Sequence, residues 1–257
     1  MNVAIMSYSF MPLWRDGRMN LFGYLESCRY RYGLQSADLW NKFLASEDDE
    51  YLEKVIDALE ERDLDVVNFA VDGAHIWDED ADAREQYYRN ALTNLSIAEK
   101  LGASTVRIDA GGTREANEFT DEQFDLIVKR YREYAQRAYD NGYKVGPENH
   151  WGPTVNPTTV RKICEAVDHP GFGILLHTAR WRGDAAEQGD ELVADWAVHT
   201  HFHGEVIESS LDEKLSLLES HGYVGSWSIE HPSESYAELA GLLGKLRFVL
   251  ESRPASA

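Results

Sequence analysis

The chain has 257 residues, with 45 Asp and Glu against 25 Lys and Arg, and a formal net charge of −20. So acidic a surface repels a phosphate backbone, which argues against nucleic acid as a partner. The apolar runs are far shorter than the roughly 20 residues that cross a bilayer, so we expect no membrane-spanning segment.

Length, cysteine content and the first residues set further limits. About 250 residues is the usual length of one (β/α)8 barrel, which favours a single domain over residues 1–257. Cys28 and Cys164 are too few for a disulfide framework or a cysteine zinc site, so we expect reduced, buried thiols. Residues 1–6 lack the basic region and cleavage site of a secretory signal, and we expect a cytoplasmic protein. The acid-rich, lysine-poor composition leaves a halophilic source open.

Short apolar runs alternate with segments of helical periodicity along the whole chain, which predicts an α/β protein. The predicted strands are Val3–Ser9, Leu34–Leu39, Val66–Val71, Thr105–Asp109, Lys144–Glu148, Gly173–His177, Ala197–His201 and Ser226–Glu230. Eight strands with helices between them predict a single TIM barrel. An open doubly wound sheet would alternate similarly, but residues 8–12 are not the glycine-rich phosphate turn that such sheets often carry after the first strand.

Capping residues mark the expected ends of the outer helices. Helices should start at Ser46–Asp49, at the capping box Thr120–Gln123 and at Asn156-Pro157. The glycines expected to end helices in a left-handed conformation are Gly102, Gly142 and Gly222.

Four polar residues end four consecutive strands in the second half of the chain. Glu148, His177, His201 and Glu230 follow one another at intervals of 29, 24 and 29 residues, each the length of one strand, one helix and their loops. Because the carboxyl ends of barrel strands meet at one mouth, these side chains should converge there. Two carboxylates and two imidazoles would suit Mn²⁺, Co²⁺, Mg²⁺ or Zn²⁺.

Two motifs resemble those of the xylose isomerase-like TIM barrels, the sugar phosphate isomerase/epimerase superfamily. Pro147-Glu148-Asn149-His150 is similar to the family's E-N-H strand end, and residues 194–202 follow its A-D-x-I-x-H-V-H-L pattern. Glu230 ends the last strand, as the family's final glutamate does. The resemblance extends over essentially the whole chain. It implies that Glu148, His177, His201 and Glu230 are metal ligands and that the two glutamates are also catalytic proton-transfer groups.

The sequence departs from the family pattern at three positions. The family usually has D-T-x-H where this chain has His177-Thr178-Ala179-Arg180, so an imidazole replaces a ligand carboxylate. The loss of one negative charge shifts the preference from Mg²⁺ toward softer metals, or marks a site that has lost its ion. Arg180 would suit a carboxylate, a phosphate or several hydroxyls, and His203 stands where the family more often has lysine.

Other residues at the expected mouth are candidates for substrate binding. His150 lies two residues after Glu148, and His75 and Trp77 follow the third strand. An aromatic ring such as that of Trp77 or Trp151 could pack on the apolar face of a sugar. Arg107 and Asp109 favour an internal salt bridge instead. His199 shares its strand face with His201, and a hydrogen-bonded interior role and a role in supporting the metal site are equally open.

The sequence therefore predicts a metal-dependent isomerase or epimerase of a sugar or sugar-derived keto compound, working by glutamate-mediated proton transfer through an enediolate. One alternative is a dehydratase or lyase of a keto-inositol or 3-keto sugar on the same barrel. A barrel that binds sugar without turnover is the other. The endonuclease branch of the superfamily does not fit, because it needs more metal ligands and a basic groove. Assembly as a homo-dimer or homo-tetramer is left open.

Overall fold

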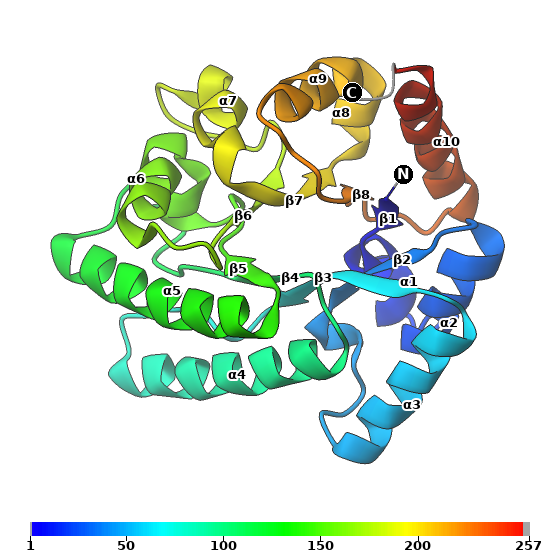
Figure 1. The fold of residues 1–257 in the computed structure, drawn as a ribbon, viewed down its shortest axis with the longest axis horizontal. Coiled ribbons are helices and arrows are strands. Elements are labelled where there is room, and N and C mark those ends of the chain that lie inside the picture. Colours follow the sequence, from blue (N-terminus) through cyan, green and yellow to red (C-terminus); the bar gives the residue numbers. More distant parts are fainter. Residues whose placement is uncertain (1, 254–257) are drawn as a thin grey trace.

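Parallel strands form the inside of the molecule in this computed structural model, which describes residues 2–253, and helices surround them (Figure 1). The strands are β1 (Val3–Ile5), β2 (Ser36–Trp40), β3 (Asp65–Val71), β4 (Thr105–Ile108), β5 (Lys144–Gly146), β6 (Ile174–His177), β7 (Ala197–Phe202) and β8 (Trp227–Ile229). The helices are α1 (Met11–Arg15), α2 (Leu21–Glu26), α3 (Asp49–Glu61), α4 (Ala81–Lys100), α5 (Asp121–Asn141), α6 (Pro157–Val167), α7 (Gly189–Val193), α8 (Gly204–Ser209), α9 (Leu211–Ser220) and α10 (Tyr236–Ser252). Within the described residues, no helix is both long and apolar enough to span a membrane.

Two four-stranded sheets, β2-β3-β4-β5 and β1-β8-β7-β6, make up the barrel. Single bridges close it along two seams. Met6 pairs with Asp38 between β1 and β2, while Val145 pairs with Phe172 and Glu148 with Leu175 between β5 and β6. The β5–β6 seam is tight, because a Cβ on Gly146 would overlap the carbonyl oxygen of Gly173. The predicted α/β barrel is therefore confirmed.

One predicted strand was wrong over most of its length. Only Val3–Ile5 of the expected Val3–Ser9 is a strand, and residues 7–10 form a 3-10 helix. After Met6, side chains take over the backbone hydrogen bonding: Ser7 Oγ accepts from the N–H of Trp40 at 2.7 Å, and Ser9 Oγ donates to the carbonyl of Ile229 at 3.1 Å. The bounds of the other predicted strands agree with the structure to within two residues.

The helix ends follow their capping residues. Asp48 and Asn156 are the N-caps of α3 and α6, and Thr120 and Gln123 form both hydrogen bonds of a capping box at the start of α5. Gly142 ends α5 with a φ of 82°, and Gly102 and Gly222 also have positive φ. Both cysteines are buried and free. In these helices the expected residues stand at the boundaries, and the N-caps of α3, α5 and α6 mark where the strand-to-helix loops at the mouth finish.

Candidate metal centre and active site

Three of the four predicted ligands meet at the mouth of the barrel. Glu148, His201 and Glu230 each offer an oxygen or nitrogen atom, and these atoms all lie within 4.8 Å of one another. His201 Nδ1 is 2.6 Å from Glu230 Oε2 and 3.4 Å from Glu148 Oε1. Glu148 and His201 are buried, and Glu230 opens onto a cavity. The strand ends β5, β7 and β8 therefore bring two carboxylates against one imidazole.

His177, the fourth predicted ligand, lies beside this group at the end of β6. Its ring is nearly perpendicular to that of His201, at an angle of 88° with the ring centroids 6.1 Å apart. Burial lowers the pKa of His177 to about 4, with the positive charge on Arg180 acting in the same direction. The ring is therefore neutral at pH 7, and its buried Nδ1 has no hydrogen-bond partner among the described residues. A neutral imidazole is the form that binds a metal ion.

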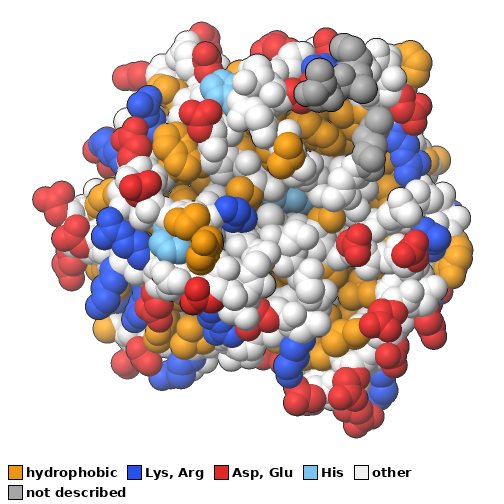
Figure 2. Space-filling model, viewed as in Figure 1, with side chains coloured by type: hydrophobic (Ala, Val, Ile, Leu, Met, Phe, Trp, Pro, Cys, Tyr) orange, Lys and Arg blue, Asp and Glu red, His pale blue; other side chains and the backbone are white. Residues whose placement is uncertain are grey.

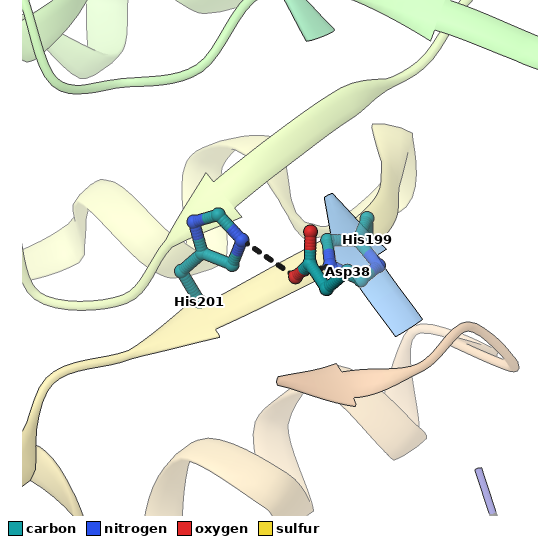
Figure 3. Close-up of side chains that lie close together, drawn as sticks. All are labelled: Asp38, His199 and His201. Atoms are coloured by element: carbon teal, nitrogen blue, oxygen red, sulfur yellow. Dashed lines mark hydrogen bonds and ion pairs between the residues drawn. The ribbon is translucent and has the colours of Figure 1, made fainter. Parts of the chain in front are cut away.

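Asp38, on β2, supports the centre from within the barrel, and the sequence analysis missed it. Its Oδ2 lies 3.0 Å from His201 Nε2 and 2.8 Å from His199 Nε2. Figure 3 shows the Asp38 carboxylate pointing toward the ring of His201. The same oxygen accepts a hydrogen bond from Ser228 Oγ at 2.6 Å, and Oδ1 accepts one from Asn68 Nδ2 at 2.8 Å. The available signal was a lone acidic residue inside an apolar strand. A carboxylate on the far nitrogen of a metal-binding histidine fixes the orientation of its ring.

Asp38, His199 and His201 also place ligand-type atoms within 4.8 Å of one another. Both oxygens of Asp38 already accept hydrogen bonds from the protein, however. His199 contacts Asp38 and does not join the cluster at the mouth. We therefore interpret this deeper group as a hydrogen-bonded support beneath the glutamates.

The surroundings hold both glutamates in the ionised form. Burial alone would raise the pKa of Glu148, but the neighbouring His150 and His201 rings hold it well below its ordinary value. Burial likewise opposes ionisation of Glu230, and the charge on His201 is the largest contribution that lowers its pKa. Two ionised carboxylates at one mouth can each accept a proton.

A buried ionic network holds Glu148 from the side of β3 and β4. Arg107 Nη1 lies 2.7 Å from Asp109 Oδ2 and 2.9 Å from Asp72 Oδ1, which confirms the predicted salt bridge between Arg107 and Asp109. Arg107 Nε is 3.4 Å from Glu148 Oε2. His150 Nδ1 lies 3.1 Å from that same oxygen. The network leaves Glu148 Oε1 without a hydrogen-bond partner in the described structure, facing His201.

Two cavities open at the mouth and share Arg180. The first, of about 590 Å³, is lined by His177, Arg180, His203 and Glu230 among others. The second, of about 510 Å³, is lined by His150, Trp151 and Arg180 among others. Histidine is visible at the central hollow of the face in Figure 2, where most acidic side chains lie toward the periphery. The structure thus brings four of the six predicted substrate-binding residues to these cavities.

The remaining two predicted substrate-binding residues, His75 and Trp77, line neither of these cavities. His75 stacks on Trp151 with their ring centroids 6.2 Å apart, and its Nδ1 is 3.9 Å from Asp109 Oδ2. Trp77 is buried, with the guanidinium of Arg84 4.5 Å above its ring. Substrate contact by Trp77 and by His75 stays a prediction, and His75 contacts Trp151, which lines the second cavity.

The donor set fits a divalent ion. Ligand atoms about 2.0 to 2.2 Å from one ion lie roughly 3 Å from each other, close to the spacing around His201 Nδ1. Glu148 Oε1 and His177 Nδ1, both buried and without a hydrogen-bond partner among residues 2–253, are of the types that coordinate such ions. Burial without a partner is costly for polar atoms, so a ligand is expected among them.

Comparison with solved structures identifies the same fold in other proteins. A D-tagatose 3-epimerase-like protein superposes with a TM-score of 0.76 at 15% identity, covering 98% of this chain and 97% of its own. A probable 3-DHS dehydratase involved in petrobactin synthesis from Bacillus anthracis gives 0.72 at 16% identity, covering 99% and 100%. A xylose isomerase-like TIM barrel protein from Mycobacterium smegmatis, in complex with magnesium, gives 0.71 at 16% identity, covering 89% of each chain.

Sequence comparison gives the family directly. No curated protein matches the chain in sequence. The sequence profile of the xylose isomerase-like TIM barrels matches residues 30–247, which include every residue of the cluster at the mouth. The chain therefore belongs to the xylose isomerase-like TIM barrel family.

Proposed function

We propose that this protein is an enzyme that isomerises or epimerises a sugar, or a keto compound derived from one, with a divalent metal ion held at the barrel mouth. The observation that carries the proposal is the meeting of Glu148, His201 and Glu230 within 4.8 Å beside a cavity. The family and the epimerase-like neighbour support the same reaction class.

Glu148, His201 and Glu230 would hold the ion, with His177 as a fourth ligand. When bound, a divalent ion supplies Lewis-acid stabilisation of the negative charge that develops on substrate oxygens. One glutamate removes the C–H proton next to the substrate carbonyl, which leaves an enediolate. The other, after taking up a proton from solvent, delivers it to the opposite face of that carbon or to its neighbour, and the first loses its proton to solvent. His150, Arg180 and His203 orient the substrate from the cavity walls, with Trp151 and His75 beside them.

Replacing either glutamate with glutamine tests the proton transfer. General acid–base catalysis contributes roughly 10² to 10⁴ in rate, so Glu148→Gln and Glu230→Gln should each lower turnover by about 100-fold or more. The measurement is solvent-deuterium incorporation into a panel of ketoses with Mn²⁺-loaded protein. Glu165→Gln, an exposed change on α6, is the control and should exchange at the wild-type rate. Near-wild-type deuterium exchange in both Glu148→Gln and Glu230→Gln would contradict the proposal. Sugar binding without exchange in the wild type would favour a barrel that binds sugar without turnover.

Metal content tests the role of His177. Because its neutral ring has an unpartnered nitrogen at the site, His177→Ala should lose bound Mn²⁺ or Zn²⁺ during dialysis. His177→Asp restores a hard oxygen ligand and should shift the preference toward Mg²⁺. Elemental analysis of the dialysed proteins measures both effects. Unchanged metal content in His177→Ala means that this residue is not a ligand.

A dehydratase is the second candidate. His150 Nδ1 lies 3.1 Å from Glu148 Oε2, which places a proton donor for a leaving hydroxyl next to a base. The structural similarity to a probable 3-DHS dehydratase is consistent with this reaction. Both reactions begin with the same proton abstraction. Mass spectrometry of the product separates them, because a dehydratase product has lost water and an isomerase product has the mass of its substrate.

A further inference from the structure

A cluster of arginines lines the second cavity at the mouth. This cavity, of about 510 Å³, is bordered by Arg114, Arg180 and Arg182 together with the rings of His150, Trp151 and Trp181. Its lining residues, all within the described part of the chain, include no aspartate or glutamate. The chain as a whole carries a net charge of −20, so a cavity with three guanidinium groups and no carboxylate is against the overall trend.

These three guanidinium groups are free to meet a ligand. Several other arginines are paired with carboxylates, such as Arg107 with Asp109 at 2.7 Å and Arg137 with Glu99 at 2.7 Å. Within residues 2–253, Arg114, Arg180 and Arg182 form no ion pair, and all three are exposed. In an acidic protein, cations left unpaired in one cavity are available for an anion from solution.

The loop that carries Arg180 is held in a fixed conformation. Ala179 has a φ of 60°, a left-handed conformation that is unfavourable for a residue with a side chain. The buried carboxylate of Asp190 compensates. Its Oδ1 accepts hydrogen bonds from Ala179 N at 3.0 Å and from Trp181 Nε1 at 2.7 Å, and its Oδ2 lies 3.1 Å from Lys214 Nζ. Asp190 therefore anchors the residues on both sides of Arg180, and one of them, Ala179, has a strained backbone. Strain that the structure maintains in this way is typical of functional sites, so we infer that the position of Arg180 is important.

The opposite wall is also ordered. The Arg114 guanidinium lies 4.7 Å from the centroid of the Trp151 ring, and Trp151 Nε1 donates a hydrogen bond to the carbonyl of Gly112 at 3.0 Å. Stacking on an aromatic ring leaves the edge of a guanidinium, with its N–H groups, free to bind a planar or tetrahedral anion. Arg180 also lines the cavity that contains His177 and Glu230. An anion held by these arginines is therefore next to the reacting centre.

We propose that Arg114, Arg180 and Arg182 form an anion subsite that binds a carboxylate or phosphate group of the substrate while the remainder of the molecule reaches Glu148 and Glu230. This inference rests on the proposed function and narrows its substrate to an acidic sugar derivative. Paired N–H groups of arginine match the oxygens of both anions. The negative charge over the rest of the molecule repels a long polyanion such as a nucleic acid, so a small anionic molecule is the ligand that fits.

Binding of three matched ketoses tests the anion subsite: D-fructose, D-fructuronate and D-fructose 6-phosphate, each titrated calorimetrically into Mn²⁺-loaded protein. We expect at least one of the two anions to bind about 10-fold or more tightly than D-fructose, and the tighter one identifies the group. Arg180→Gln and Arg182→Gln should each remove most of this preference. Arg247→Gln, which removes the same charge beside Gly33 at the other end of the barrel, should keep it. Far-ultraviolet circular dichroism checks that the variants are folded.

The outcomes separate this inference from the proposed function. Equal affinity for all three ketoses, or an unchanged preference in Arg180→Gln and Arg182→Gln, overturns the anion subsite. Deuterium exchange into a neutral ketose at full rate, without any anion preference, leaves the proton-transfer proposal standing while the subsite falls. Glu148→Gln should show the converse, an intact anion preference with little exchange.

Discussion

The carboxylate of Asp38 sets the orientation of the His201 imidazole ring. Its carboxylate contacts His201 Nε2 on the side away from Glu148 and Glu230, so Nδ1 is the nitrogen that faces the two glutamates. Burial alone would raise the pKa of Asp38, but the two adjacent histidine rings lower it far below its ordinary value. The carboxylate is therefore ionised, and it orients the ring that faces Glu148 and Glu230.

Replacing Asp38 with asparagine should weaken metal binding without removing a ligand. Loss of such a supporting carboxylate typically lowers metal affinity by roughly 10- to 100-fold. Competition with a fluorescent chelator for Mn²⁺ measures the change. Asp65→Asn, on an exposed residue at the start of β3, provides the charge-matched control and should bind Mn²⁺ as the wild type does. Wild-type affinity in Asp38→Asn would mean that His201 needs no support from this carboxylate.

Substituting Ala179 tests the strain beside Arg180. Glycine tolerates a φ of 60°, so Ala179→Gly should stabilise the protein by up to about 1 kcal/mol after its extra unfolded-state entropy is subtracted. Ala240→Gly, an exposed change inside α10, should instead destabilise by about 1 kcal/mol. Urea unfolding measures both variants. A destabilisation of equal size in both would show that Ala179 is not strained.

At the scale of elements, α4 and α5 are joined by one carboxylate. Glu99 of α4 lies 2.7 Å from two nitrogens of Arg137 on α5, and its Oε1 accepts a hydrogen bond from Tyr143 at 3.0 Å. Burial raises the pKa of Glu99, but Arg137 and Tyr143 lower it by more, so the net shift is downward. The contact between the two longest helices is therefore sensitive to acid.

The sign of that sensitivity follows from the shift. The pKa of Glu99 is lower in the folded protein than in the unfolded chain, where it is near 4.3. The stabilisation is therefore complete above the unfolded-state pKa and is lost as the pH falls through the folded-state pKa. We expect the wild type to exceed Glu99→Gln in unfolding free energy by roughly 0.5 to 1 kcal/mol at pH 7, with the difference shrinking below pH 4.5. Urea unfolding across this range measures it. Glu85→Gln, in an exposed pair on α4, should show almost no difference at any pH.

Closure of the whole barrel depends in part on Tyr24, whose hydroxyl contacts both β1 and β2 at the seam between them. Its hydroxyl lies 2.8 Å from the carbonyl oxygen of Ile5 and 3.0 Å from that of Asp38, either of which can accept its one proton, and it accepts from the N–H of Asp38 at 2.9 Å. Beside it, Met6 and Asp38 form only a single bridge between these strands. The hydroxyl thus supplies hydrogen bonds between β1 and β2, where the backbone forms only one bridge. It also holds the backbone of Asp38 in place.

Removing this hydroxyl should destabilise the barrel. Tyr24→Phe leaves buried backbone groups without partners, at a cost of about 2 kcal/mol, or a fall in Tm of roughly 4 to 8 °C for a chain of this size. Differential scanning calorimetry measures it. Tyr139→Phe deletes the same hydroxyl from a side chain that is 58% exposed and should leave Tm nearly unchanged. Equal Tm values for both variants would contradict a structural role for the Tyr24 hydroxyl.

Local patterns were sufficient for most of the fold, because each strand and helix carries its own apolar period and caps. The residues at the strand ends could be predicted equally well, since parallel strands must bring Glu148, His201 and Glu230 to one mouth. The role of Asp38 could not be predicted, because its partner His201 lies 163 residues away and no pattern in its own strand indicates that contact. Arg114 and Arg182 were missed for the same reason. Their significance comes from a cavity that loops of three different strands enclose.

The two seams also constrain how the proposed metal centre is assembled. Glu148 and Asp38 belong to the sheet β2-β3-β4-β5, whereas His177, His201 and Glu230 belong to the sheet that contains both the first strand and the last. Because β1 pairs along its length only with β8 among the described strands, that sheet is incomplete until the chain has been synthesised past residue 229. The proposed ligands therefore come from both sheets, and the set is complete only once the two sheets have met along their seams.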